Sequence, residues 1–412
     1  MVTYIRQLMV TGDVYQGEYE GWYDAGQEEY VPENKAKEQG YRSAISGKPL
    51  VKKKEHNYFF ALSKYQQALR QLLEEQPEFV QPEARRNEVL GRIREGLNDV
   101  AISRTGAGGW GIAMPGDPEQ TIYVWIDALF NYYTAVDAEE RRRYWPADVH
   151  LIGKEILWFH AVIWPAMLLA LGWPLPRQVY AHSYWIAEGQ KMSKSLGNFI
   201  DLERIDHYVA AFSLDALRWF LCTQGPLGST DSDFAHDRFV EVYNTDLANT
   251  LGNCASRVTN MIGRYFDGQV PASPAGREDS DARRLRAAAV ESGLIVADLY
   301  DKLAVGAANE AAMELVRQID GYIELTQPFK LAKDPDQRDR LAMVLYHCAE
   351  SLRIASLHLY PVMPRKVEQL WTMLGLQYDT NNGELGKWRE WGGLKPGTKI
   401  TKGEALFPRV IP

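Results

Sequence analysis

The sequence predicts an α/β domain with a parallel sheet, followed by an all-α helical bundle. Strand-like runs alternate with helical runs up to about Gly225, an order that is typical of parallel α/β sheets. From residue 235 onward the pattern is almost wholly helical, which favours an antiparallel bundle. We therefore expect one domain over 1–225, a second over 226–375 and an extended tail over 376–412.

The first half begins with what reads as the end of a helix, which we expect to stop at Gly12 and Asp13. Residues 16–58 are rich in Tyr, Gly and charged side chains and predict a small β-containing insert. Helical spacing follows at 63–76. The next predicted elements are a strand from Thr121 to Ile126 that changes into a helix, a strand–turn–helix unit over 148–164, and a strand with a loop over 179–195.

The second half contains four runs with the periodicity of amphipathic helices. They are separated by short polar segments, of which 268–280 is the longest that we identify. The predicted helices cover residues 239–262, 281–303, 309–326 and 338–360.

Composition limits the class of protein. The 412 residues are 46% hydrophobic and 24% charged, as expected of a globular chain with sizeable cores. The net charge of −8 argues against a protein coated in nucleic acid but allows a local basic face. Cys222, Cys254 and Cys348 are far apart and odd in number, so we expect no disulfide framework and a reducing cytoplasm.

The apolar run from Ile156 to Trp173 is long enough to raise the question of a membrane span. His160 and Pro165 interrupt it, so we interpret it as a buried helix. The start of the chain has no basic-then-apolar signal pattern. We expect no membrane association.

The string GQKMSKSLGN, residues 189–198, suggests a loop that handles phosphate. Its flanking glycines allow tight bends and close backbone approach to a ligand. Its two lysines and two serines supply positive charge and hydroxyl donors, which suit phosphate oxygens as charge develops on them. A solvated lysine turn is the alternative for a bare K-x-x-K, but the five-residue string with its Gly-Asn exit is more specific.

Lys191 to Ser195 reads KMSKS and resembles the signature of class I aminoacyl-tRNA synthetases. The chain is similar to the methionyl-tRNA synthetase family along nearly its whole length, with ordered agreement at 12–23, 57–66, 85–90, 102–105, 122–135, 150–168 and 250–268. The resemblance implies a Rossmann-like catalytic domain followed by an anticodon-binding helical domain. It implies a ligase that activates methionine with ATP and transfers it to methionine tRNA.

The resemblance also implies roles for the loop. Lys194 and Lys191 would be the catalytic cations that offset phosphate charge, assisted by Mg²⁺. ATP would also contact Ser193, Ser195 and Gly153.

Family correspondence places a methionine pocket in two of the matched segments. Methionine carries an uncharged thioether, so its selection depends on shape and on soft sulfur–aromatic contacts. Glu155, Phe159 and Ile163 are four residues apart and would share one face of a helix. The alternative is a set of core aromatics with one buried histidine. The implied pocket residues are Trp125, Ala128, Tyr132, Glu155, Phe159 and His160.

An anticodon-reading face is implied in the helical half. Asn249, Asn253 and Arg257 have the spacing i, i+4 and i+8, which places them on one side of a helix. Amides and a guanidinium suit the edges and faces of unpaired bases. Phe329 stands where the family stacks an aromatic residue, usually Trp. An exposed polar face is the alternative from spacing alone.

Two departures from the family pattern matter. Where many relatives carry zinc-binding Cys-x-x-Cys pairs, this chain has Asp24, Gln27, Ser43 and Ser46, so we expect no zinc. A His-Ile-Gly-His type motif at the end of a first Rossmann strand is absent, since His56 begins HNYF and His150 begins HLIG. We therefore expect the first strand of the catalytic domain to be missing.

That second departure leaves alternatives open. Three explanations compete: a misassigned gene start or a fragment of an ordinary enzyme, a split enzyme completed by another polypeptide, and a non-catalytic tRNA-binding remnant. Other class I synthetases are disfavoured, because the 16–58 insert is too short for an editing domain. Arg104 is a weaker active-site candidate, and a salt-bridge role is equally compatible with it. We expect a cytoplasmic monomer.

Overall fold

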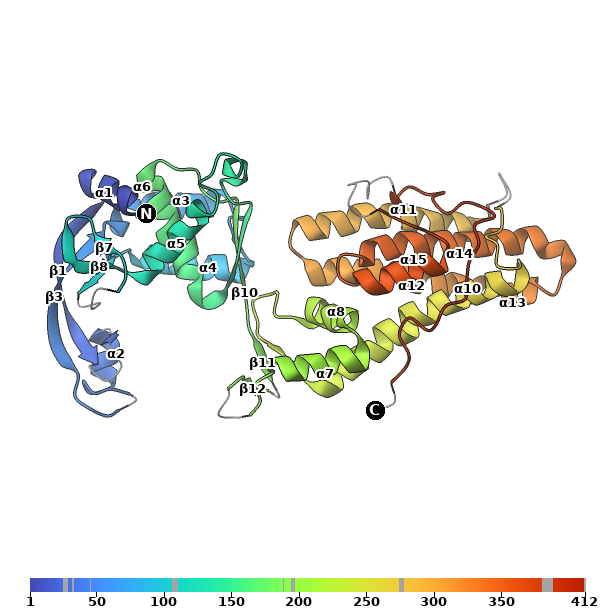
Figure 1. Ribbon diagram of the computed structural model, residues 1–412, viewed down its shortest axis with the longest axis horizontal. Coiled ribbons are helices and arrows are strands. Elements are labelled where there is room, and N and C mark those ends of the chain that lie inside the picture. The colour runs from blue at the N-terminus through green and yellow to red at the C-terminus, as the bar shows by residue number, and fades with distance from the viewer. Residues whose placement is uncertain are drawn as a thin grey trace. The chain divides into compact units, whose positions relative to one another are not determined.

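The protein is described by a computed structural model that covers residues 1–24, 29–31, 33–44, 46–105, 110–187, 189–193, 197–273, 278–379 and 388–410. The chain forms two compact units, unit 1 over Met1–Ser183 and unit 2 over Tyr184–Pro412 (Figure 1). Each unit is considered by itself.

Unit 1 mixes short strands with helices of several types. In chain order its elements are α1 (Val2–Val10), β1 (Val14–Asp24), β2 (Glu29–Val31), α2 (Glu33–Glu38), β3 (Val51–Phe60), the 3₁₀ helix η1 (Leu62–Tyr65), α3 (Gln66–Glu75), β4 (Val80–Gln81), α4 (Glu83–Glu95), β5 (Val100–Ala101), β6 (Ser103–Thr105), β7 (Ala113–Met114), β8 (Asp117–Ile122), α5 (Val124–Thr134), the 3₁₀ helix η2 (Arg142–Tyr144), β9 (Val149–Gly153), the 3₁₀ helix η3 (Lys154–Ile156), the π-helix η4 (Phe159–Ile163), α6 (Trp164–Leu171) and β10 (Gln178–His182).

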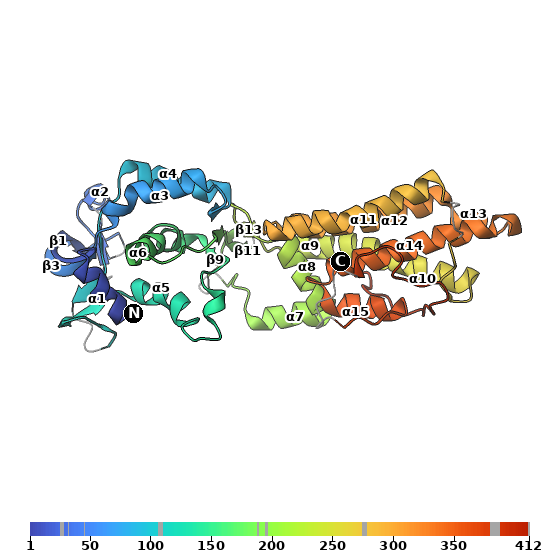
Figure 2. The ribbon, with the colours of Figure 1, turned by 90° about the horizontal axis from the view of Figure 1, so that it is seen from above.

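Unit 1 contains a parallel sheet in the order β4-β10-β9. Val179 of β10 pairs with Val80 on one side and with His150 on the other. Figure 2 shows α3 and α4 side by side along one side of α6, with α5 along the other. The predicted parallel α/β arrangement is confirmed, and helices cover strands as such sheets require.

The predicted β-containing insert is confirmed as a long antiparallel ladder. β1 and β3 pair from Val14↔Phe60 to Tyr23↔Val51, and Figure 1 shows the ladder extending away from the helices with α2 near its far end. Glu33 ties that end together, because it accepts hydrogen bonds from Trp22 Nε1 at 2.7 Å and from Tyr41 Oη at 3.1 Å.

The strand predicted from Thr121 to Ile126 is wrong beyond Ile122. β8 ends at Ile122, and α5 begins two residues later at Val124. The run VWI is compatible with either structure, because apolar β-branched residues do not decide between a short strand and a buried helix. Packing decides it: Ile126, Leu129 and Phe130 are spaced to face the core of unit 1 from one side of α5.

The apolar run from Ile156 is a buried helix, as predicted. Trp164, Ala166, Met167 and Leu168 of α6 are fully buried in the core of unit 1. The run is not one regular helix, however, because the π-helix η4 precedes α6. No helix within the described ranges is both long and apolar enough to cross a membrane.

Unit 2 is mostly helical. In chain order its elements are β11 (Trp185–Ala187), β12 (Gln190–Lys191), α7 (Leu202–Phe212), α8 (Leu214–Gln224), β13 (Ser232–Asp233), α9 (His236–Val242), the π-helix η5 (Tyr243–Gly252), α10 (Asn253–Tyr265), α11 (Ser280–Asp301), α12 (Val305–Thr326), α13 (Pro328–Leu331), the 3₁₀ helix η6 (Pro335–Gln337), α14 (Arg338–Leu359) and α15 (Pro364–Met373).

The bundle is built around α14, which contacts α10, α11, α12 and α15. Its burial is almost continuous from Leu341 to Leu359, so the helix has no solvent-facing stripe. The predicted helical bundle is confirmed. α8 also packs on α12 and places Trp219 and Phe220 in the same core, so the compact units divide at 183/184, whereas we placed the domain boundary at 225/226. That functional boundary stays a prediction.

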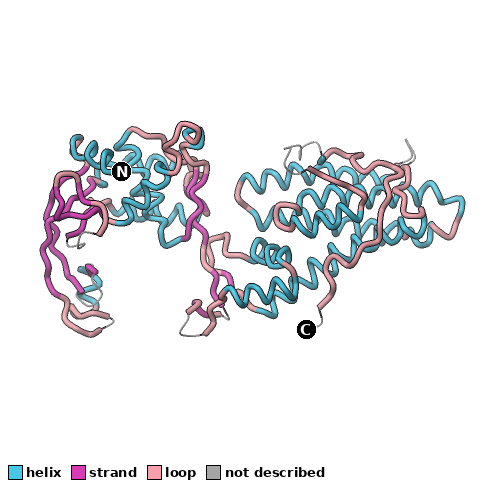
Figure 3. The backbone as a smooth tube through the Cα atoms, in the orientation of Figure 1, coloured by secondary structure: helices cyan, strands magenta, loops and turns pink. Residues whose placement is uncertain are grey.

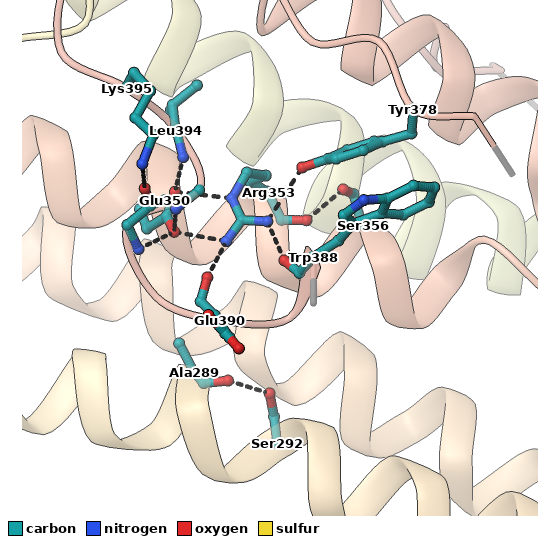
Figure 4. A network of polar contacts seen from close by, with 12 residues as sticks. Ala289, Ser292, Glu350, Arg353, Ser356, Tyr378, Trp388, Glu390, Leu394 and Lys395 are labelled. Carbon is teal, nitrogen blue, oxygen red and sulfur yellow. Dashed lines mark hydrogen bonds and ion pairs between the residues drawn. The ribbon is translucent and has the colours of Figure 1, made fainter. Parts of the chain in front are cut away.

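The C-terminal segment is irregular and lies along the helices of the bundle (Figure 3). A fully buried ion pair fastens it, as Figure 4 shows. Glu350 accepts hydrogen bonds from the backbone N–H groups of Gly392, Gly393 and Leu394, while Arg353 donates to the carbonyl oxygens of Trp388 and Glu390. Both charges are therefore saturated by each other and by the chain that they hold.

Candidate functional site

The candidate pocket begins at the carboxyl end of β9, the end at which ligands bind in parallel α/β sheets. Gly153 is the last residue of β9, and η3 and η4 follow it directly. α5 contributes the facing side chains. The structure thus places Gly153 and the predicted methionine-pocket residues on neighbouring segments of unit 1.

Two aromatic rings of the predicted pocket are stacked. The centroids of Trp125 and Phe159 are 4.5 Å apart with an interplanar angle of 15°. Phe159 and Ile163 also line a cavity of about 350 Å³, to which Arg104 contributes from β6. Arg104 lies over the ring of Tyr123 at 4.5 Å and donates a hydrogen bond to the carbonyl oxygen of Ser103 at 2.9 Å. Its role in the active site stays a prediction.

Tyr132 and His160 are predicted pocket residues that form a polar pair, one from α5 and one from η4. The Tyr132 hydroxyl lies 2.8 Å from His160 Nε2, and His160 Nδ1 lies 2.9 Å from the carbonyl oxygen of Ile156. Burial lowers the pKa of His160 and raises that of Tyr132, so both side chains are uncharged near neutral pH. This neutral pair of side chains is compatible with an uncharged ligand side chain.

The helical spacing that we used for this pocket is wrong for Glu155. Glu155 lies in a 3₁₀ helix, whereas Phe159 and Ile163 lie in a π-helix, so the three residues are not on one regular α-helix. Glu155 is exposed, whereas Phe159 and Ile163 line the cavity. Ala128 is half-buried on α5. The substrate-contacting roles of Glu155 and Ala128 stay predictions.

His150 is a member of this site that the sequence interpretation missed. It is 3% exposed in β9, and its ring lies 4.1 Å from that of Tyr132 and 5.9 Å from that of His160. We call Tyr132, His150 and His160 the ring cluster. The alternation of β9, with His150 and Ile152 buried and Leu151 exposed, is a sequence signal that could have placed His150 inward.

The lysine loop belongs to unit 2, and its ends are held by side-chain hydrogen bonds. Asn198 Oδ1 accepts from the backbone N–H of Ser193 at 2.8 Å, and its Nδ2 donates to the carbonyl oxygen of Lys191 at 3.2 Å. Gly189 and Gly197 have φ of 72° and 67°, a region that glycine adopts without strain. The Gly-Asn exit therefore closes the base of the loop.

Lys191 is exposed at the end of β12 and available to a ligand from solvent. Lys194 and Ser195 lie outside the described residues, so their predicted contacts with ATP are not tested by the structure. Ser193 is half-buried at the start of the loop. The phosphate-binding roles of all four residues stay predictions.

Arg257 of α10 lies between two carboxylates of α12. Its Nη1 is 3.0 Å from Asp320 Oδ1, and its Nη2 is 2.5 Å from Glu324 Oε1. Burial raises the pKa of Asp320, and the guanidinium of Arg257 opposes that rise. We call these three residues the ion-pair cluster. It holds the guanidinium in place while leaving it partly exposed.

The predicted anticodon face is only partly regular. Asn253 and Arg257 are separated by four residues of α10 and lie on one side of it, as predicted. Asn249 lies in the π-helix η5, so the α-helical spacing that we assumed for it is wrong. Asn249, Asn253 and Phe329 are exposed, and Phe329 follows the turn that ends α12, five residues after Glu324. Their contacts with RNA stay predictions.

The four positions that replace zinc ligands lie in the insert. Asp24 and Ser43 are buried, and Ser43 Oγ accepts a hydrogen bond from the backbone N–H of Ser46. Gln27 lies outside the described residues. Within the part of the chain that the structure describes, no group of three or more His, Cys, Asp or Glu is placed to hold a metal ion. The expectation that zinc is absent stays a prediction.

A family model described as "tRNA synthetases class I (M)" matches residues 37–259. A methionine–tRNA ligase of Caldanaerobacter subterraneus subsp. tengcongensis is 43% identical over 98% of this chain. A methionine–tRNA ligase of Bacillus subtilis is 40% identical, also over 98% of the chain. The chain spans 62% of the length of each of these two curated relatives.

Two solved structures are similar over the whole fold. The apo form of Mycobacterium tuberculosis methionyl-tRNA synthetase aligns with a TM-score of 0.84 and 34% identity, over 100% of this chain and 81% of that one. The same enzyme in complex with methionyl-adenylate aligns with a TM-score of 0.85 and 35% identity, over 98% and 79% of the two chains. At this identity the likeness confirms the predicted fold class.

Proposed function

Because the chain belongs to the class I tRNA synthetases of the methionyl type, we propose that it is a methionine–tRNA ligase. It would activate methionine with ATP to methionyl-adenylate and then transfer the methionyl group to methionine tRNA. The observation that carries the proposal is the group of uncharged side chains near the carboxyl end of β9, in which Trp125 stacks on Phe159 and Tyr132 is hydrogen-bonded to His160. The similarity to methionine–tRNA ligases and to a methionyl-tRNA synthetase in complex with methionyl-adenylate supports this assignment.

The pocket selects methionine by shape and polarity. Trp125 and Phe159 supply aromatic faces and edges with which a thioether sulfur makes favourable contacts. Tyr132 and His160 are neutral, so these two side chains offer no charge to a charged competitor. Ala128 leaves room beside them on α5, and Glu155 lies outside the pocket at the strand end, where a substrate amino group would carry positive charge.

The lysine loop acts on ATP. In adenylate formation the carboxylate of methionine attacks the α-phosphorus, the bond to the bridging oxygen breaks, and pyrophosphate leaves. Negative charge grows on the phosphate oxygens, and Lys191 and Lys194 offset it together with Mg²⁺ that accompanies the nucleotide. Ser193, Ser195 and Gly153 supply hydroxyl and backbone contacts. Asn198 keeps the base of the loop closed.

The helical domain binds the tRNA. Asn249, Asn253 and Arg257 present amide and guanidinium groups to unpaired anticodon bases, and Phe329 offers a stacking surface. The exposed positions of Asn249, Asn253 and Phe329 support this role. We expect the chain to act in the cytoplasm as a monomer, with residues 226–375 as the anticodon-binding domain.

The test is methionine-dependent ATP–pyrophosphate exchange by the 412-residue chain. Lys194→Ala should lower exchange by about 100-fold or more, because it removes one transition-state cation. Lys302→Ala is the matched control, since Lys302 is exposed directly after α11 and its ammonium group pairs with Asp298 of that helix. Wild-type exchange that survives Lys194→Ala would contradict the role of the loop.

Two negative results have different meanings. A chain that shows no exchange but binds a methionine anticodon stem-loop would be the tRNA-binding part of a synthetase and would contradict the ligase proposal. A chain with neither property would contradict both assignments.

A further inference from the structure

His150 is a buried titratable group that the proposed mechanism does not use. Its ring lies against Tyr132 with centroids 4.1 Å apart and planes tilted by 49°, and it faces His160 at 5.9 Å. The three residues come from β9, α5 and η4. Two residues of the proposed methionine pocket therefore rest on a third that lies in the sheet itself.

The hydrogen bonds of the ring cluster fix where its protons lie. The carbonyl oxygen of Ile156 can only accept, so His160 Nδ1 at 2.9 Å carries the hydrogen. A neutral His160 then has a lone pair on Nε2, and the Tyr132 hydroxyl at 2.8 Å must donate to it. The one proton of the Tyr132 hydroxyl is thus committed to His160. Toward a ligand, Tyr132 presents its ring and an oxygen lone pair.

This arrangement depends on the plane of the Tyr132 ring, and His150 packs against that ring. His150 is 97% buried, and burial lowers its pKa to about 4, with His160 as a second cause. The residue that pairs with His150 across the sheet on β10 is Val179, which does not titrate. An uncharged imidazole therefore supports the ring, and the support is the same throughout the neutral pH range.

The imidazole of His150 also has an energetically unfavourable feature. Its Nε2 is buried and has no hydrogen-bond partner among the described residues. A buried unpaired polar atom is unfavourable, and an apolar side chain of similar shape would avoid the penalty. Such an atom beside a ligand pocket indicates that the ring serves the pocket rather than the stability of β9.

We propose that His150 is a positioning residue for methionine: its ring holds Tyr132 in the plane from which the hydroxyl donates to His160. The inference rests on the proposed function, because it assigns the ring cluster to the methionine pocket. Loss of the His150 ring frees the Tyr132 side chain to rotate. Rotation breaks the hydrogen bond to His160 and displaces the Tyr132 ring that methionine contacts. ATP binding, which does not involve the ring cluster, is unaffected.

The experiment compares His150→Ala, which removes the ring, with His150→Phe, which keeps a ring but no nitrogen. Kinetics of ATP–pyrophosphate exchange give KM for methionine, KM for ATP and kcat. We expect His150→Ala to raise KM for methionine about 10-fold, with KM for ATP and kcat changed less than about twofold. His150→Phe should recover most of the loss, since it restores a flat support for Tyr132.

His358→Phe is the matched control. His358 is also buried, burial also lowers its pKa to about 4, and its Nε2 is bonded to Ser292 in unit 2. It should leave KM for methionine unchanged at a similar cost in stability. Equal changes in KM for methionine and for ATP, or a control that behaves like His150→Ala, would reduce His150 to a structural residue and overturn the inference.

A second measurement does not depend on activity. Imidazole ¹⁵N NMR of the free chain should report His160 as the Nδ1–H tautomer in the wild type and in His150→Phe, and a tautomer mixture in His150→Ala. An unchanged tautomer together with unchanged methionine affinity by calorimetry overturns the inference. A wild-type chain that binds no methionine overturns the proposed function instead, and the tautomer then decides the role of His150.

Discussion

The ring cluster of unit 1 and the ion-pair cluster of unit 2 hold their polar groups in opposite ways. In the ring cluster, burial lowers the pKa of two histidines and raises that of a tyrosine, so three titratable groups are uncharged. In the ion-pair cluster, Arg257 keeps its charge between two carboxylates and is partly exposed.

The difference matches the ligands that we propose for the two regions. An uncharged thioether side chain is best met by a dry, uncharged surface, because an unpaired buried charge is costly. RNA is polyanionic, so a guanidinium must remain charged and reachable by solvent. The contrast also predicts different sensitivities: the ring cluster should respond to pH, and the ion-pair cluster to salt and to charge substitutions.

The largest change in stability should come from a charged pair that is buried as fully as the side chains of the ring cluster. Arg353 and Glu350 are both fully buried, so Arg353→Met leaves the Glu350 carboxylate uncompensated. We expect the free energy of unfolding of unit 2 to fall by about 3–5 kcal/mol, measured by urea denaturation. Arg340→Met is the control, because Arg340 is half-exposed and 3.7 Å from Asp279, and it should cost less than about 1 kcal/mol. Equal costs would show that the buried pair is not special.

The second effect is a pH dependence of unit 1. The pKa of His150 is about 4 in the folded chain and near its ordinary value of about 6.5 when unfolded, so the unfolded chain binds more protons between these values. The contribution of neutral His150 to the free energy of unfolding is therefore fully present above pH 6.5. It is lost as the pH falls toward 4, by up to about 3 kcal/mol. Urea denaturation of the 412-residue chain at pH 7, 5.5 and 4.5 measures the loss.

Two titratable groups face His150, Tyr132 from α5 and His160 from η4. Tyr132 keeps its proton throughout this pH range, because burial raises its pKa. Burial also lowers the pKa of His160, so His160 likewise contributes a loss of stability as the pH falls. His150→Phe should flatten the pH dependence of unit 1 and His358→Phe that of unit 2. A His150→Phe profile identical to that of the wild type would contradict the neutral state that we assign to His150.

The third effect concerns the charged side of the comparison. Arg257→Ala should weaken binding of a methionine anticodon stem-loop by about 10- to 100-fold, because a guanidinium contact to a base contributes about 1–3 kcal/mol. Adenylate formation should be unchanged. Arg264→Ala, which removes an exposed arginine from the same helix, should weaken binding far less. Equal loss of exchange and of stem-loop binding would contradict the division of labour between the two domains.

The smallest effect should come from the exposed member of the ion-pair cluster. Glu324→Gln removes one carboxylate from Arg257, whose other partner Asp320 remains. We expect stem-loop binding to tighten by no more than about fivefold, since exposed ion pairs contribute roughly 0–1 kcal/mol, and the gain should shrink between 50 and 200 mM salt. Glu314→Gln on the same helix should leave binding unchanged, because Glu314 pairs with Arg317 instead. Weaker binding by Glu324→Gln would mean that the carboxylate positions Arg257.

The sequence by itself determined the class of each half. Alternating apolar runs predicted the parallel strands β9 and β10, and continuous helical periodicity predicted α11, α12 and α14, because these patterns follow from backbone geometry and burial alone. The KMSKS string and the pocket segments were recognisable because their chemistry lies in local residue order. The Gly-Asn exit makes the string more specific than a bare pair of lysines. In the structure, the hydrogen bonds of Asn198 to Ser193 and Lys191 close the base of the loop.

Features that depend on contacts between distant segments could not be predicted from residue order. Packing against the core of unit 1 accompanies the helical conformation of residues 124–126, and the segments of Phe159 and Asn249 are π-helices instead of regular α-helices. The approach of His150 to Tyr132, and of Arg257 to Asp320 and Glu324, is likewise tertiary. Periodicity records how a segment alternates between core and solvent, whereas partners from other elements set its helix type, its proton positions and its charge state.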